Sequence, residues 1–187
     1  MKMFLATTGC ELMIERIEAG RSISDVDARD HVERVERLIE LSDLLTGDTQ
    51  VGFSGQAAEW LFEDVKATWI YGCFVGTVLT AHAFSLLQVS GQIRLVSDDP
   101  NLAEEAFSLE HLGELAVAAG AIDIELQTQL LRLHDLHRLY TAARLREHLP
   151  ALEVHLDESE TVSQDPPLLV DARFALMTAA RVLYRHS

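Results

Sequence analysis

The longest uncharged stretch of the chain runs from Ala67 to Ile93 and contains no Asp, Glu, Lys or Arg. A helix that is apolar on nearly all sides is surrounded by other groups, either lipid or protein, and about 20 apolar residues suffice to span a bilayer. Polar side chains recur along this stretch, however, and a histidine such as His82 is costly in hydrocarbon without a partner. The flanking Lys66 and Arg94 give no positive-inside asymmetry. We therefore expect a central helix in a helical bundle, and no membrane partner.

Two glycines, Gly72 and Gly76, form a G-x-x-x-G pair inside this stretch. Small residues one turn apart allow another backbone to approach closely. In a membrane this spacing marks helix dimers, whereas in a soluble bundle it marks a tight helix crossing, which is the interpretation we favour. The pair alone predicts no function.

Apolar residues also recur at three- and four-residue steps before and after the uncharged stretch, as amphipathic helices require. Before it, the pattern predicts one helix at residues 9–19 and a second that Ser24 caps and that ends at Gly47. Ser54 is expected to cap the central helix, which would begin near Ala57 and run without a break to residues 98–101.

Three further helices are predicted after the central one. The first starts at Ser108 and stops at Gly120, and the second covers residues 122–148, with Ile124 among its apolar positions. The third covers residues 168–185, because Asp165-Pro166-Pro167 is a helix-start signal. No segment predicts a strand.

Length and composition agree with these patterns. The chain has 187 residues and 20.8 kDa, enough for one sizeable core. Its few prolines and many Leu, Ala, Glu and Arg residues favour helices. We expect an all-α fold with a single domain over residues 1–187: an N-terminal helix pair at residues 1–47 and a bundle core at residues 54–187.

The formal net charge of -15 disfavours binding to RNA, because phosphate-backbone binding requires a basic surface. One local exception lies between residues 132 and 148, where Arg and His residues gather. The two cysteines, Cys10 and Cys73, form no C-x-x-C motif and support neither a disulfide framework nor a zinc site. A reducing cytoplasm fits this cysteine usage.

Candidate chemistry is sparse. His134 and His137 are three residues apart and could share one metal ion, but helical di-metal sites use Glu-x-x-His motifs, which the chain lacks. The alternative is two partly exposed histidines on a polar helix face, and we expect no metal and no cofactor. His82 is expected to be a core or interface histidine satisfied by a hydroxyl or carbonyl. Nucleophile elbows, phosphate-binding loops and paired carboxylates are absent from the sequence.

The order of the later segments resembles the HEPN superfamily of small helical-bundle proteins. The segments are YGCFVGTVLTAHAFSLLQ, FSLEHLGELAVAAGAI, LQTQLLRLHDLHRLYTAAR and DARFALMTAARVLYR. They match the family's Ala-rich central helix, its Leu-x-x-Leu-Ala helix, the helix that carries an Arg-x4-6-His motif, and a closing helix that begins Asp-Ala. The resemblance covers residues 60–184.

In active HEPN members the motif's Arg and His form a ribonuclease centre, usually across a dimer interface. Aligning the aromatic residue of the common Arg-Asn-x-x-x-His form on Tyr140 puts His137, Arg138 and Ala142 at the Arg, Asn and His positions, so both catalytic residues are lost. A second register is intact, because Arg132 and His137 are literally Arg-x4-His. Guanidinium could stabilise phosphorane charge while imidazole transfers a proton, but residues five apart share a helix face poorly. We favour the degenerate register.

Three functions remain open from the sequence. The first is a catalytically degenerate bundle, non-enzymatic or weakly active, that acts by self-association as a homodimer or by binding a protein partner. The resemblance implies a bacterial defence or toxin-antitoxin setting for it. The second is a metal-independent ribonuclease toxin with Arg132 and His137 as catalytic residues. The third is a structural subunit of a larger complex. In the first two, Arg138, Tyr140 and Arg144 are the candidate binding residues.

Overall fold

The computed structural model describes residues 25–45, 52–97, 99, 108–144 and 166–184. These residues form six helices and no strand, which confirms the predicted all-α helical bundle. In chain order the helices are α2 (Asp25–Leu45), α3 (Gln56–Ile70), α4 (Phe74–Val96), α5 (Leu109–Ala118), α6 (Ile124–Arg144) and α8 (Pro167–Leu183).

The chain divides into two compact units, Met1–Thr46 and Gly47–Ser187. The division falls next to the expected limit of the N-terminal helix pair. In the first unit, α2 follows the predicted amphipathic helix, and an ion pair of 3.5 Å joins Arg37 to Glu33 one turn away. The helix predicted at residues 9–19 and the Ser24 cap lie outside the described residues. A single domain over residues 1–187 stays a prediction.

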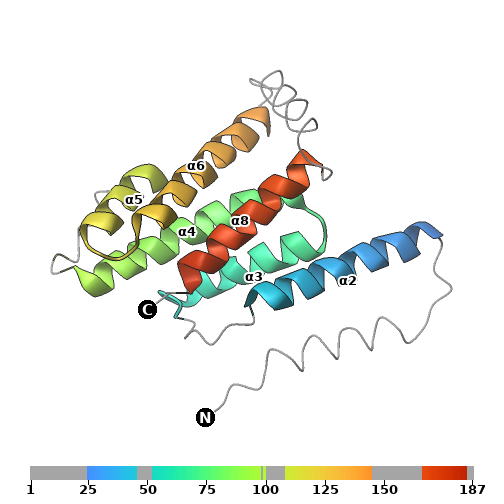
Figure 1. Ribbon diagram of the computed structural model, residues 1–187, viewed down its shortest axis with the longest axis horizontal. Coiled ribbons are helices and arrows are strands. Elements are labelled where there is room, and N and C mark those ends of the chain that lie inside the picture. Colours follow the sequence, from blue (N-terminus) through green and yellow to red (C-terminus); the bar gives the residue numbers. More distant parts are fainter. Residues whose placement is uncertain (1–24, 46–51, 98, 100–107, 145–165, 185–187) are drawn as a thin grey trace, which may run out of the picture. The chain divides into compact units, whose positions relative to one another are not determined.

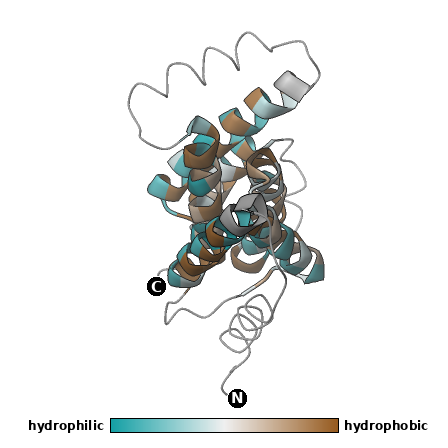
Figure 2. Cartoon of the chain, turned by 90° about the vertical axis from the view of Figure 1, so that its right-hand side faces the viewer, coloured by the Kyte–Doolittle hydropathy of each residue, from teal (hydrophilic) through white to brown (hydrophobic). Residues whose placement is uncertain are grey.

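In the second unit, α4 is the central helix, because it contacts α3, α5, α6 and α8 (Figure 1). Hydrophobic and hydrophilic residues both occur along the helices (Figure 2), and the buried hydrophobic ones form the core. The largest fully buried apolar side chains come from all five helices: Trp69, Phe84, Ile93, Leu109, Leu130, Leu133 and Leu176.

The prediction of one unbroken central helix is wrong. The chain turns at residues 71–73 and forms a helical hairpin of α3 and α4, because Gly72 adopts a positive φ of 71° that favours glycine. The amide of Gly72 donates to the carbonyl of Trp69, and the amide of Cys73 donates to the carbonyl of Thr68. These two bonds form a Schellman motif, which ends a helix.

The interpretation of the G-x-x-x-G pair is therefore only half right. Gly72 makes the turn and takes no part in a helix crossing. Gly76 lies in the first turn of α4, where a Cβ atom would be 3.2 Å from Cγ2 of Thr68, so α3 and α4 do approach closely at this point.

The boundaries of α5 agree with the predicted signals. Ser108 is its N-cap, and its hydroxyl accepts a bond of 3.2 Å from the amide of His111. Gly120 follows its end with a φ of 69°, and the amides of Gly120 and Ala121 donate to the carbonyls of Val117 and Ala116, which is a second Schellman motif.

The predicted cap at Ser54 is wrong. The N-cap of α3 is Gly55, with no side-chain cap bond. The Ser54 amide instead donates to Oε1 of Gln88 over 2.8 Å, and its hydroxyl donates to the carbonyl of Leu87. Ser54 lies against Gly91, where a Cβ atom would come within 2.0 Å of the serine Cβ. The segment before α3 is therefore anchored on the side of α4.

Two details differ at the start of α6. Asp123, which the sequence patterns did not single out, accepts a bond of 2.6 Å from the amide of Leu126. Ile124, predicted on the apolar side, is 71% exposed. The predicted helix start before α8 is confirmed, since Pro167 is its first residue.

By length and composition, α4 is also long and apolar enough to span a membrane. The core helix of a soluble protein meets the same criteria, so the absence of a membrane stays a prediction.

Candidate functional site

Three histidines from two helices meet between α4 and α6. The central helix supplies His82, and α6 supplies His134 and His137, whose three-residue spacing places both on one helix face. His82 is buried and the other two are half-buried. We call these residues the histidine cluster.

The geometry of the histidine cluster is close and specific. Nε2 of His82 lies 3.2 Å from Nδ1 of His134, within hydrogen-bond distance. The rings of His82 and His137 are stacked, with centroids 3.8 Å apart and an interplanar angle of 9°. One nitrogen of the His82–His134 pair must carry a proton and the other a lone pair, so this bond requires at least one neutral imidazole.

Burial governs the protonation of His82 and His137. It lowers the pKa of His82 from 6.5 to about 3, with smaller contributions from His137 and then His134. The pKa of His137 is also lowered, first by burial and then by His134. Both rings are therefore neutral at pH 7, because a buried charge without an opposite partner is costly.

His137 has one poorly satisfied nitrogen. Its Nε2 lies 3.4 Å from the hydroxyl of Thr141, whereas its Nδ1 is buried without a hydrogen-bond partner among the described residues. The in-plane lone pairs of stacked rings do not converge on one point. Consistent with this, the described residues contain no group of three His, Cys, Asp or Glu side chains that could hold a metal ion.

The candidate catalytic residues Arg132 and His137 face different helices. The Arg132 guanidinium lies over the Phe174 ring of α8, 4.1 Å from its centroid, whereas His137 stacks on His82 of α4. In the part of the chain that the structure describes, no hydrogen bond or ring contact joins the two. Ala142, which takes the motif's histidine position in the degenerate register, is half-buried on α6.

The candidate binding residues also have different surroundings. Arg138 is exposed, and the side chain of Arg144 lies outside the described residues. Tyr140 is only 2% exposed, and its hydroxyl donates a bond of 2.7 Å to Oδ2 of the buried Asp171. Burial, followed by this bond, raises the pKa of the Tyr140 hydroxyl. Tyr140 therefore joins α6 to α8 inside the core and offers no contact to a partner at the surface.

Sequence reasoning missed the partners of His82 and Tyr140. For His82 a hydroxyl or carbonyl was expected, but the structure gives two imidazoles from α6. A histidine in an uncharged helix indicates that some polar partner exists, although nothing local indicates which one. Asp171 gave a similar signal, because a carboxylate in a largely apolar helix needs a hydrogen-bond donor when it is buried.

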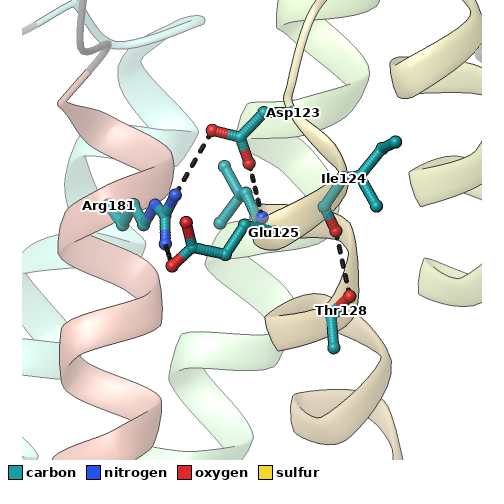
Figure 3. A network of polar contacts seen from close by, with 6 residues as sticks. Asp123, Ile124, Glu125, Thr128 and Arg181 are labelled. Atoms are coloured by element: carbon teal, nitrogen blue, oxygen red, sulfur yellow. Dashed lines mark hydrogen bonds and ion pairs between the residues drawn. The ribbon is translucent and has the colours of Figure 1, made fainter.

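A second polar network joins the other end of α8 to the start of α6 (Figure 3). Arg181 contacts Glu125 at 2.6 Å and Asp123 at 3.2 Å, while Asp123 also caps α6. The pKa of Asp123 is lowered, first by the amide of Leu126. Both carboxylates are exposed, so this network positions two helix ends and forms no enclosed site.

A surface hollow of about 290 Å³ lies where the start of α3 meets α4. It is lined by Ser54, Gly55, Gln56, Ala57, Ala58, Leu87, Ser90, Gly91 and Arg94. Arg94, the one charged residue of this lining, already has an interaction of its own. The lining contains no His, Asp, Glu, Lys or Cys, so the hollow holds no general base that could activate its two serines.

Comparison of the chain with protein families, curated proteins and solved structures finds no match.

Proposed function

We propose that the chain is an HEPN-like helical protein that is catalytically degenerate and acts through self-association or partner binding. The main observation in support of catalytic degeneracy is that Arg132 contacts α8 while His137 stacks on α4. The defence or toxin-antitoxin setting rests on the resemblance alone.

The chemistry of RNA cleavage supports this proposal. Cleavage by the intact register needs the guanidinium and the imidazole at the same phosphate, one to stabilise charge and the other to transfer a proton. The Nδ1 of His137 is buried, and burial lowers the pKa of this residue. A lowered pKa makes this imidazole a weaker general base, and its buried Nδ1 is closed to a substrate hydroxyl.

Exposed apolar side chains on the second unit support the binding part of the proposal. Trp60 on α3 is 62% exposed, and Tyr71, which follows the last residue of that helix, is 55% exposed. Aromatic side chains of this kind are enriched at protein interfaces. A second copy of the chain would cover them.

We expect the purified protein to be a dimer. Light scattering at roughly 10 µM, a concentration above the micromolar or lower dissociation constant of a stable dimer, should give about twice the chain mass of 20.8 kDa. Trp60→Asp should shift the equilibrium towards monomer, because it puts a charge into the covered surface. Glu59→Gln, at the neighbouring exposed position, is the matched control. A wild-type monomer over the whole concentration range would contradict self-association.

We also expect no metal-independent cleavage of unstructured or transfer RNA, measured by gel with EDTA present. General acid–base catalysis supplies about 10²–10⁴-fold in rate, which is absent without a positioned imidazole. Arg132→Ala, His137→Ala and the exposed control Arg34→Ala on α2 should match the wild type. Cleavage that is lost in the first two variants and kept in Arg34→Ala would establish the alternative, a ribonuclease with Arg132 and His137 as its catalytic pair.

A further inference from the structure

We propose that the histidine cluster is an acid-sensitive contact that holds α6 on α4 at neutral pH and that mild acid weakens, so that α6 separates from α4 more often. His82 comes from one helix and both of its ring contacts come from the other, at 3.2 Å and 3.8 Å. This inference does not depend on the proposed function.

Protonation opposes both contacts. In a doubly protonated His82–His134 pair each facing nitrogen carries a hydrogen, so the bond of 3.2 Å is lost. In the stack, a charged ring would lie 3.8 Å from His137 in a buried setting. Two like charges at such a distance repel strongly when little water separates them.

Among the described residues, no negative charge compensates a proton on His82. Within α6, His137 and His134 are the groups that act electrostatically on His82, and both lower its pKa. From the other helices packed on α4, namely α3, α5 and α8, no described charged side chain contributes to that shift. The buried carboxylate of α8, Asp171, is bonded to Tyr140.

The direction of the pH effect follows from the lowered pKa values. His82 stays neutral in the folded protein down to about pH 3, whereas an exposed histidine titrates near 6.5. The stabilising contribution of neutral His82 is complete above pH 6.5 and is lost as the pH falls below that value. A single proton taken up only on opening raises the opening equilibrium constant about 25-fold between pH 7 and pH 5, because an opened histidine begins to bind its proton only near pH 6.5.

Native-state hydrogen exchange, followed by mass spectrometry at pH 7 and pH 5 with EDTA present, tests the proposal. After correction for intrinsic exchange rates, amides of α6 should open about 25-fold more at pH 5, while those of α3 should change much less. Equal increases in both helices would mean that acid unfolds the whole unit, and would overturn the proposal.

Two variants and a control complete the test. His137→Phe keeps an aromatic ring in the stack and removes one titrating group, and His82→Phe removes the most buried one. Each should reduce the pH response of α6, and His137→Phe alone suffices if His82→Phe does not fold. The control is His111→Phe, on the exposed side of α5, which should keep the wild-type response. An unchanged response in His137→Phe and His82→Phe, or a response lost in His111→Phe, would refute the role of the histidine cluster.

Discussion

Replacing Gly91 by alanine is expected to destabilise the protein by about 3 kcal/mol, at the upper end of the usual cost of overpacking. The added Cβ would lie 2.0 Å from Cβ of Ser54 and 3.3 Å from its Cα, so the backbone before α3 must move. That movement disturbs the bonds from Ser54 to Gln88 and Leu87. Urea-induced unfolding followed by circular dichroism measures the change.

A matched glycine gives the opposite expectation. Gly113 is also helical and buried, but its added Cβ would meet only Cγ of Gln127, at an ordinary 3.4 Å. Gly113→Ala should therefore be neutral or stabilise by about 0.5–1 kcal/mol, through lower entropy of the unfolded chain. Ser54→Gly should restore part of the stability of Gly91→Ala. Equal effects of the two Gly→Ala changes would contradict the close packing of Ser54 on α4.

Tyr140→Phe is expected to lower the free energy of unfolding by about 2–3 kcal/mol. The change removes the donor that lies 2.7 Å from the carboxylate of Asp171, which is 4% exposed. Loss of a bond to a buried charged acceptor costs more than loss of an ordinary hydrogen bond. Denaturant unfolding at pH 7 gives the difference from the wild type.

Two further measurements connect the result to this bond. Tyr71→Phe alters an exposed tyrosine and should stay within about 0.5 kcal/mol of wild type. The raised pKa of Tyr140 means that its contribution is present below pH 10 and is lost as the pH rises above that value, since the phenol ionises more readily in the unfolded chain. Tyr140→Phe should therefore be less sensitive than the wild type between pH 9 and pH 11. Identical alkaline sensitivity would argue against the Tyr140–Asp171 bond.

The sequence was sufficient for α2, α5, α6 and α8 because their signals are local. The periodic leucines of α6, the Ser108 cap and the prolines before α8 each act within one or two turns of the chain. Gly72 is instructive because the same residue is compatible with a helix crossing and with a helix end. The uncharged composition of residues 67–93 concealed the turn, since a tight hairpin between two buried helices needs no polar loop.

The side-chain partners of the candidate site could not be predicted because they depend on packing between distant segments. His82 and His134 are 52 residues apart, and Tyr140 and Asp171 are 31 apart. Tyr140, a candidate binding residue from the sequence, lies on the buried side of its helix. The choice of partner depends on how α6 and α8 are placed around α4, and sequence spacing carries no information about that placement.

The position of α8 has a consequence for how the protein is made. α8 covers one side of α4 and accepts, through the carbonyl of Val182, a bond of 2.8 Å from the buried Gln92. On the ribosome, α8 emerges after α3, α4, α5 and α6, which can form their two hairpins early because those contacts are local. Until α8 is synthesised, the apolar side of α4 that it covers is exposed in the nascent chain. We expect chaperones to bind this exposed surface during that interval.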